Sequence, residues 1–381
     1  MNDHPHSNVA RILVIGDPYL ESHIIANYLE SVFPGDHIAA VDWELADLAE
    51  LALRNRHMEL NGPDHSLLTE NVASVLQSEL WDAVVTQFAP LAAQAVERVR
   101  PGGWVGVLRA GTENVDLKAC QERNITVFSS PGRNANAVAE FALGMILAET
   151  RQIARSHEQF RRGDWEKSFG RPLPRELKYL TVGIVGCGAV GRLLAEKLVA
   201  LGSSLLICDP IAGERAIEGL PADKVRMVEL EELLQKSDVV TLHARANGDG
   251  PLIGEKQLSL MRKDAILVNT ARAELVDEAA VLRALSERRI GGVAFDVYAE
   301  EPPAADSPWR TIEQATLTPH MGGATADAFT RSPEVLCKIM ARYATRGDLH
   351  GVVVHDTASR EAFVRRWEDR MRQIIERMND Q

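Results

Sequence analysis

The sequence predicts an α/β protein with two doubly wound domains, each built on a parallel sheet. Short apolar segments alternate with amphipathic ones along most of the chain, as parallel strands alternate with crossover helices. A glycine-rich turn at residues 186–191 lies between one such strand and the helix that follows it. At 381 residues, the chain is long enough for both domains.

The composition is that of an ordinary globular protein, with 45% hydrophobic and 25% charged residues. The formal net charge of −12 and the pI near 5.5 argue against a nucleic-acid or anionic-membrane partner. We expect neither a signal peptide nor a transmembrane helix, because no stretch approaches the ~20 apolar residues that span a bilayer. The four widely spaced cysteines argue against a zinc site or a disulfide framework, and they predict a cytoplasmic location.

The first domain is expected to cover residues 1–131 as a smaller, flavodoxin-like doubly wound unit. Its first strand ends at Gly16, and we expect Asp17 and Pro18 to open a helix that runs to about Val32. The strands of this domain are predicted at residues 11–16, 37–43, 82–88, 104–111 and 125–130.

The segment at residues 131–165 is predicted to begin as a loop and to continue as one long helix. Its apolar residues recur at helical spacing, which favours a helix that bridges the two domains. These residues are Val138, Phe141, Ala142, Met145 and Ile146.

The second domain, residues 132–324, is expected to be a Rossmann-type unit that binds NAD. Gly186 permits a tight turn, Gly188 lets a pyrophosphate approach the backbone, and Gly191 lets the helix pack closely on the strand. The N-terminus of that helix offers free N–H groups to the phosphates. Asp209 ends the next strand, where a carboxylate hydrogen-bonds the adenosine ribose and repels a 2′-phosphate, so NAD is favoured over NADP.

Residues 325–381 are expected to form a helix that returns to the first domain, followed by a C-terminal tail. The tail is predicted to be an amphipathic helix that caps a core or forms an interface. Its apolar face consists of Phe363, Trp367, Met371, Ile374 and Met378.

Several stretches, in a fixed order, resemble the D-isomer-specific 2-hydroxyacid dehydrogenase family. They are "RAGTENVD", "NANAVAEF", "GCGAVG…CDP", "AILVNTARAELVDEAAVLRAL", "GGVAFDVYAEEPP" and "LTPHMGGAT", and they cover roughly residues 105 to 325. The resemblance implies an oxidoreductase that transfers a hydride between a D-2-hydroxy acid and NAD, giving a 2-keto acid. It also implies that NAD lies in the cleft between the two domains and that the protein is a homodimer.

The chemistry of hydride transfer assigns roles to three residues within these stretches. Arg272 is expected to hold the substrate carboxylate, since a guanidinium binds a carboxylate with a planar pair of hydrogen bonds. His320 is the expected general acid/base, with its pKa raised by a neighbouring carboxylate. Alignment with the family places that carboxylate at Glu301, with Glu300 as the competing assignment. Formate dehydrogenases of this superfamily carry a glutamine there, so Glu301 argues against that activity.

The resemblance extends to further binding residues. Backbone N–H groups of Ala110, Gly111 and Thr112 are expected to share the substrate carboxylate. Asp296 is similar to the aspartate that holds the nicotinamide carboxamide, and the alternative is that it only caps the following turn. The remaining expected cofactor contacts are Val138, Ala189, Val190, Leu242, His243, Ala244, Thr270, Ala271 and Gly323.

Some positions depart from the family pattern and leave alternatives open. Arg133 either contacts a second acidic group on the substrate or is a hinge residue with a surface salt bridge. Glu274, close to Arg272, either faces solvent or restricts the substrate. We expect no C-terminal regulatory domain of the amino-acid-binding kind. A second reading is an NAD(H)-sensing binding protein, like the corepressors of this superfamily, without significant turnover.

Overall fold

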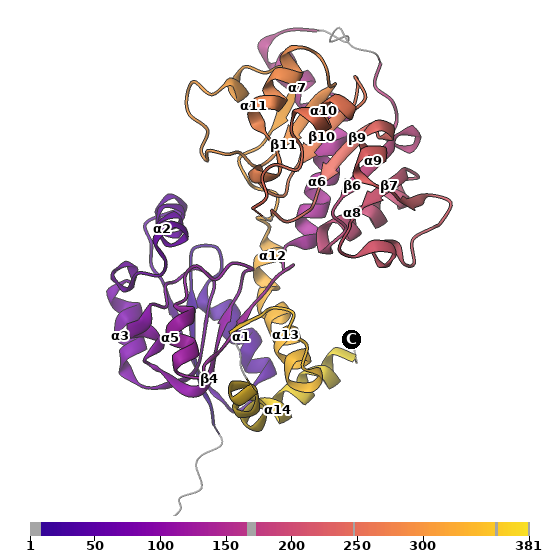
Figure 1. Cartoon of the computed structure of the whole chain (residues 1–381). Helices are drawn as coiled ribbons and strands as arrows, with labels where there is room; N and C mark the ends of the chain where they lie inside the picture. The colour runs from indigo at the N-terminus through magenta and orange to yellow at the C-terminus, as the bar shows by residue number, and fades with distance from the viewer. Residues whose placement is uncertain (1–8, 166–172, 247, 355–356, 380–381) are drawn as a thin grey trace, which may run out of the picture. The chain divides into compact units, whose positions relative to one another are not determined.

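The computed structural model describes residues 9–165, 173–246, 248–354 and 357–379, and it contains two compact units (Figure 1). Unit 1 comprises residues 1–133 and 326–381, and unit 2 comprises residues 134–325. Each unit is a parallel sheet, except for one antiparallel strand in unit 1, and helices cover both of its faces, which confirms the predicted fold class. Within the described ranges, no helix is both long and apolar enough to cross a membrane.

The sheet of unit 1 has six strands in the order β13-β5-β4-β3-β1-β2. All neighbouring strands are parallel except β13, which runs antiparallel to β5. The chain therefore leaves β1 toward one side of the sheet and later returns to β3 on the other side. The strands are β1 (Arg11–Gly16), β2 (His37–Asp42), β3 (Trp81–Thr86), β4 (Val99–Val107), β5 (Thr126–Ser129) and β13 (Val352–Val354).

Alternate residues of these strands face two separate apolar cores. Ile12 and Val14 pack with α1, α13 and α14 on one face, whereas Leu13 and Ile15 pack with α2 to α5 on the other. The helices are α1 (Ser22–Val32), α2 (Leu48–Asn61), α3 (Glu70–Ser78), α4 (Ala93–Val96), α5 (Leu117–Glu122), α12 (Ala326–Thr330), α13 (Ser332–Arg346) and α14 (Thr357–Asn379).

The first helix begins later than expected. Asp17 and Leu20 exchange backbone hydrogen bonds of 3.0 Å, and the Asp17 carboxylate accepts a further bond of 2.9 Å from the Tyr19 amide. This closed turn occupies the residues that were predicted to open the helix, so α1 starts only at Ser22.

The long helix predicted at residues 131–165 is interrupted. It consists of α6 (Ala135–Thr150) and α7 (Ile153–Arg162), separated by Gln152 in the left-handed conformation with φ of +58°. The turn lets Arg155 reach back to the buried Glu149 carboxylate at 2.6 Å. A hydrogen bond of 2.8 Å from Thr316 to the same carboxylate ties this corner to the sheet.

The sheet of unit 2 has seven parallel strands in the order β12-β11-β10-β9-β6-β7-β8. Helices α6 and α8 (Ala189–Ala200) cover one face, and α9 (Leu230–Lys236), α10 (Glu255–Leu260) and α11 (Glu278–Ser286) cover the other. The strands are β6 (Thr181–Val185), β7 (Ser204–Cys208), β8 (Val225–Met227), β9 (Val239–Leu242), β10 (Ile266–Asn269), β11 (Gly292–Phe295) and β12 (Ala315–Leu317).

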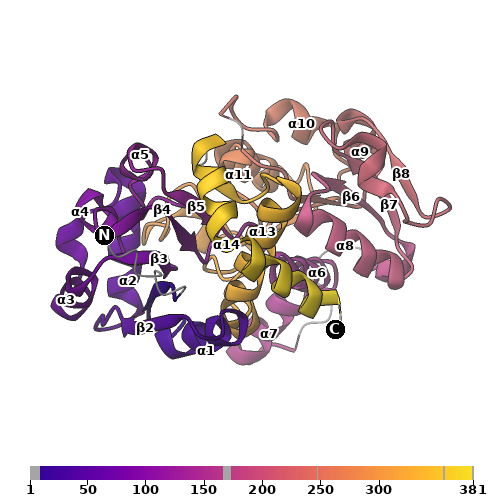
Figure 2. The same ribbon diagram turned by 90° about the horizontal axis from the view of Figure 1, so that it is seen from below.

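Helix α14 closes the core of unit 1, as its apolar pattern predicts, and lies beside α13 (Figure 1, Figure 2). Phe363, Trp367, Met371 and Ile374 are all buried in this core. The Met378 side chain lies outside the described residues. The Trp367 ring meets Trp104 and Phe33 edge to face, with centroids 5.6 and 5.8 Å away.

Replacing this tryptophan tests how much α14 contributes to unit 1. Trp367→Ala is expected to lower the free energy of unfolding by about 3–5 kcal/mol, because it leaves a large cavity between aromatic rings. Urea unfolding followed by circular dichroism measures the change. Glu361→Ala, at an exposed position of the same helix, should stay within about 0.5 kcal/mol of the unchanged protein. Equal losses for the two variants would contradict the packing role.

Candidate functional site

The glycine-rich turn between β6 and α8 shows why each glycine is required. Gly186 has a φ of +87°, and a Cβ there would lie 2.5 Å from the Ala244 amide nitrogen. A Cβ on Gly191 would lie 2.2 Å from the Gly186 carbonyl oxygen. A Cβ on Gly188, by contrast, would meet no heavy atom of the described chain within 4 Å, and the φ there is an ordinary −71°. The missing side chain of Gly188 therefore leaves space for a ligand rather than for the protein's own packing.

Asp209 follows β7 and is joined to the glycine-rich turn. Its carboxylate accepts hydrogen bonds from the amides of Cys187 at 2.8 Å, Ile211 at 3.1 Å and Ala212 at 2.9 Å. Partial burial opposes ionisation, but these three bonds outweigh it and lower the pKa of Asp209. The carboxylate is thus charged and fixed beside the turn.

The other predicted cofactor residues of unit 2 lie mostly where parallel strands end. Leu242 ends β9 and is followed by His243 and Ala244, and Thr270 and Ala271 follow β10. Ala189 and Val190 form the first turn of α8, Val138 lies on α6, and Gly323 is beside Asn134. His243 is bonded to the Thr241 hydroxyl at 2.9 Å, and burial lowers its pKa to about 4, so its ring is neutral at physiological pH.

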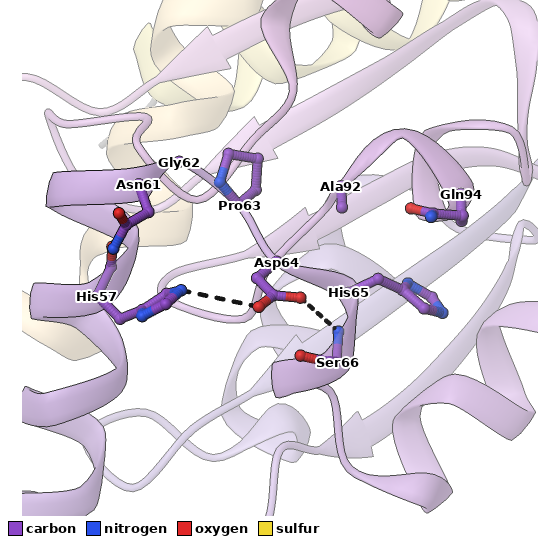
Figure 3. A pocket seen from close by; sticks show the side chains of 9 residues that line it. All are labelled: His57, Asn61, Gly62, Pro63, Asp64, His65, Ser66, Ala92 and Gln94. Carbon is purple, nitrogen blue, oxygen red and sulfur yellow. Dashed lines mark hydrogen bonds and ion pairs between the residues drawn. The ribbon is translucent and has the colours of Figure 1, made fainter.

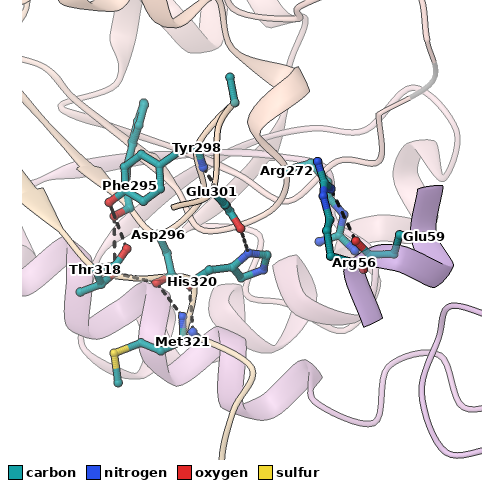
Figure 4. Close-up of polar contacts among 12 residues, drawn as sticks. Arg56, Glu59, Arg272, Phe295, Asp296, Tyr298, Glu301, Thr318, His320 and Met321 are labelled. Atoms are coloured by element: carbon teal, nitrogen blue, oxygen red, sulfur yellow. Dashed lines mark hydrogen bonds and ion pairs between the residues drawn. The ribbon is translucent and has the colours of Figure 1, made fainter. Parts of the chain in front are cut away.

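His320 has a left-handed backbone, with φ of +50°, in the loop that follows β12. Its Nδ1 lies 2.7 Å from Oε2 of Glu301, as Figure 4 shows. The hydrogen bond to Glu301 raises the pKa of His320 and outweighs the opposing effect of partial burial. The imidazole side chain is 53% exposed, so it remains accessible to a ligand, while the hydrogen bond to Glu301 fixes its orientation.

Glu301 is itself held in place by the chain that precedes it. Its Oε1 accepts a hydrogen bond of 2.9 Å from the Tyr298 amide, which leaves Oε2 for His320. Desolvation by burial raises the pKa of Glu301, but the hydrogen bond from His320 helps to lower it, and the net shift is downward. The carboxylate bonded to His320 is that of Glu301 and not that of the neighbouring Glu300.

Asp296 forms hydrogen bonds that anchor the His320 loop (Figure 4). Its Oδ1 accepts hydrogen bonds from the Thr318 hydroxyl at 2.7 Å and the Met321 amide at 2.9 Å. Its Oδ2 accepts one from the Gly322 amide at 2.8 Å. The sequence did not indicate this role, and the residue that could have signalled it is Thr318, two positions before the histidine.

Arg272 lies at the carboxyl end of β10, immediately before a short 3₁₀ turn at Ala273–Leu275. Its guanidinium is exposed, donates a hydrogen bond of 2.7 Å to the Ala271 carbonyl, and forms no ion pair within the described residues. It is close enough to oppose the rise in the pKa of His320 and to favour ionisation of Glu301. Glu274 is also exposed.

The predicted substrate-binding turn belongs to unit 1, between β4 and α5. Ala110 is exposed, while Gly111 and Thr112 are partly buried. A Cβ on Gly111 would lie 2.4 Å from Oε2 of Glu113, which is the end of a flexible side chain.

A hollow of about 580 Å³ elsewhere in unit 1 contains none of the predicted site residues (Figure 3). Its main polar groups already interact with one another, since Asp64 accepts a bond from the Ser66 amide and lies 3.7 Å from His57. The hollow is lined by His57, Asn61, Gly62, Pro63, Asp64, His65, Ser66, Ala92 and Gln94. In the described parts of the chain, no group of His, Cys, Asp and Glu is arranged to hold a metal ion.

Comparison with known proteins places the chain among dehydrogenases. The model of the D-isomer specific 2-hydroxyacid dehydrogenase NAD binding domain matches residues 143–322. D-3-phosphoglycerate dehydrogenase of Methanocaldococcus jannaschii is 32% identical over 263 residues, which are 69% of this chain and 48% of that protein. Glycerate dehydrogenase of Methylorubrum extorquens is 36% identical over 252 residues, 63% of this chain and 75% of that protein.

Solved structures agree on the fold. D-lactate dehydrogenase with NAD⁺ from Lactobacillus jensenii has a TM-score of 0.67 at 22% identity, covering 91% of this chain and all of that one. The chain spans about half the length of the D-3-phosphoglycerate dehydrogenases it matches.

The open space at Gly188 gives a test of cofactor binding that is separate from folding. Gly188→Ala is expected to weaken NADH binding about tenfold or more without destabilising the protein, because the added methyl meets only the space that a pyrophosphate approaches. Fluorescence titration with NADH and urea unfolding measure the two quantities. Gly144→Ala, at an open position of α6, is the matched control and should leave NADH binding unchanged. An undiminished affinity in Gly188→Ala would contradict the assignment.

Proposed function

The chain belongs to the D-isomer specific 2-hydroxyacid dehydrogenase family, and we propose that it catalyses reversible hydride transfer between a D-2-hydroxy acid and NAD, giving a 2-oxo acid. The observation that carries the proposal is the His320–Glu301 pair, whose atoms lie 2.7 Å apart. His320 is accessible and has a raised pKa, and the nearby Arg272 has no ion-pair partner in the described chain. Together they are suited to bind a hydroxy acid and to move its hydroxyl proton.

In the proposed mechanism, His320 moves the hydroxyl proton. Its Nδ1 is engaged by Glu301, so Nε2 is the atom that faces the substrate. Neutral His320 takes the proton when the hydroxy acid is oxidised, and protonated His320 returns it when the 2-oxo acid is reduced. Glu301 stabilises the imidazolium in either direction. Bound NAD supplies the hydride acceptor, and NADH supplies the donor.

Arg272 is proposed to bind the substrate carboxylate through two parallel N–H donors. Within the described chain, the Arg272 guanidinium donates a hydrogen bond only to the carbonyl of the preceding residue, Ala271. Most of its N–H donors are therefore available for a substrate. The backbone N–H groups of residues 110–112 are proposed as additional donors to the carboxylate.

For the cofactor, we propose that Asp209 binds the adenosine ribose and that the amides of the Gly186–Gly191 turn bind the pyrophosphate. Asp296 is proposed to hold the nicotinamide carboxamide as well as the His320 loop. Its Oδ2 accepts one bond, from Gly322, and so keeps a lone pair for a further donor. The proposed contacts also include Val138, Ala189, Val190, Leu242, His243, Ala244, Thr270, Ala271 and Gly323.

The protein is further proposed to be a cytoplasmic homodimer that uses α7 as part of its interface. Helix α7 buries no residue in its own unit, and Phe160 and the nearby Trp165 are 63% and 77% exposed. Large exposed aromatic side chains of this kind are typical of interfaces. The four cysteines are unpaired, in keeping with a reducing compartment.

Removal of the proposed acid/base tests the reaction. His320→Ala is expected to lower turnover of 2-oxo acids at least about a hundredfold while leaving NADH binding unchanged, because the imidazole moves a proton and does not hold the dinucleotide. Loss of NADH absorbance with a panel of 2-oxo acids measures turnover. Full activity in the variant would overturn the assignment. Tight NADH binding by the unchanged protein without any turnover would favour an NAD(H)-sensing binding protein.

The His320–Glu301 pair also predicts a pH dependence. Reduction requires protonated His320, so kcat/KM for reduction should fall as pH rises through its raised pKa, while oxidation should rise. Glu301→Gln removes the charge that favours imidazolium, so both transitions should move to lower pH. The matched control is Glu300→Gln, next to it in the chain and exposed. Identical profiles for the two variants would refute the pairing.

A further inference from the structure

The carboxyl ends of four strands in unit 1 bring together polar side chains that the proposed mechanism does not use. Ile15, Thr86, Val107 and Ser129 lie side by side across β1, β3, β4 and β5. The residues that follow them therefore share one edge of the sheet. Because the chain leaves β1 and β3 in opposite directions across the sheet, this edge includes a topological switch point, where α/β proteins bind ligands.

Asp17 directly follows β1 and Gln87 directly follows β3 at that switch point, and both are buried. Neither the amide nitrogen nor the amide oxygen of Gln87 has a hydrogen-bond partner in the described part of the chain. Oδ2 of Asp17 also lacks one. Buried polar groups nearly always have partners, so a bound ligand or ordered water at this sheet edge would satisfy these three atoms.

Arg133, which follows β5, is a partly buried cation that is near the Asp17 carboxylate but forms no ion pair within the described residues. One of its terminal nitrogens donates to the Ala328 carbonyl at 3.1 Å, and its guanidinium carbon lies 4.8 Å from the centre of the Phe329 ring. It makes no ion pair within the described residues, so the surface salt bridge considered from the sequence is not seen there. Burial and, to a smaller extent, the neighbouring charge of Arg109 lower the pKa of Arg133 to about 10, while Asp17 works in the opposite direction.

Arg109, at the end of β4, gives the contrast. Its two terminal nitrogens donate to Asn55 at 2.9 Å and to Glu113 at 2.8 Å, so its charge is already compensated. It stacks on Phe88 at 4.9 Å, just as Arg133 stacks on Phe329. Of these two neighbouring arginines, only Arg133 is left to bind an external anion.

Three aromatic rings connect these arginines into one surface. Tyr19 stacks on Phe329 with centroids 4.7 Å apart, and its centroid lies 6.2 Å from that of Phe88. The surface thus runs from Arg109 over Phe88, Tyr19 and Phe329 to Arg133. Asp17 lies close enough to influence both guanidinium groups.

We propose that this edge of unit 1 binds a second anionic group of the acid substrate on Arg133, with the Gln87 amide hydrogen-bonding a polar group beside it. The identity of the ligand as the substrate rests on the proposed function. The substrate class is then a 2-hydroxy acid that carries a second carboxylate or a phosphate. Rigid stacking of Arg133 on Phe329 holds the guanidinium ready for that group.

Matched pairs of substrates test the proposal. 2-Oxoglutarate and 2-oxopentanoate differ in one terminal carboxylate, and 3-phosphohydroxypyruvate and hydroxypyruvate differ in one phosphate. We expect kcat/KM to be at least about tenfold higher for the member of one pair that carries the second anionic group. The other member cannot form the charge-assisted hydrogen bond to Arg133. The pair that shows the preference identifies the anion. Equal use of both members in both pairs would overturn the proposal.

Arg133→Gln should raise KM for the preferred charged substrate about tenfold or more and leave kcat/KM for its neutral counterpart within about twofold. The neutral substrate controls for misfolding, because a damaged protein would lose both activities. Lys118→Gln removes one exposed charge from the same unit and should change neither. Equal losses on both members of a pair in Arg133→Gln would contradict the assignment.

Gln87→Met separates ligand binding from a structural role. Methionine has a similar size and no amide, so the variant should lose about threefold or more in kcat/KM for the charged substrate without a lower urea midpoint. A lower midpoint with unchanged kinetics would show that Gln87 is structural and would overturn its part in the proposal.

A separate measurement distinguishes failure of this inference from failure of the proposed function. If no 2-oxo acid is reduced, calorimetric titration of the full chain with malonate and with inorganic phosphate still reports on Arg133. Binding that Arg133→Gln weakens about tenfold, and Lys118→Gln does not, would support the anion site alone. Absence of binding to the unchanged protein would overturn it.

Discussion

The buried carboxylate of Asp296 is the interaction on which the candidate site depends. It satisfies the Thr318 hydroxyl and the amides of Met321 and Gly322 at once, on both sides of His320. A left-handed backbone at a non-glycine residue is unfavourable, and the hydrogen bonds around it compensate for that strain. The direction of the imidazole is therefore set by the strand end that carries Asp296, and Glu301 then fixes which ring nitrogen is engaged.

The arginines of the two units fall into two kinds: some stabilise the structure through ion pairs, and others have no carboxylate partner among the described residues. Arg155 is paired with the buried Glu149 and closes the corner between α6 and α7. Arg109 is likewise paired, with Glu113 and Asn55. Arg272 and Arg133, however, donate to backbone carbonyls and are without a carboxylate partner among the described residues. A cation that the fold orients but does not neutralise keeps its affinity for an anion.

The features that the sequence predicted well are those decided by short-range chemistry. The Gly186–Gly191 turn could be recognised because each glycine answers a local steric need, and the apolar stripe of α14 because burial imposes a period of 3.6 residues. The break at Gln152 and the late start of α1 were missed. Both depend on local sets of hydrogen bonds, around Glu149 and between Asp17 and Leu20, which the residue pattern alone does not reveal.

The role of Asp296 was missed for a related reason. Its three donors are 22 to 26 residues away in the chain, and they meet it only because β11 and β12 are neighbouring parallel strands. The same geometry explains why Asp209, Arg272 and His320 all follow the carboxyl ends of strands. In a parallel sheet these ends share one edge, so groups far apart in sequence converge there without any local signal. Sequence spacing can name the candidates, but only the order of strands decides which of them meet.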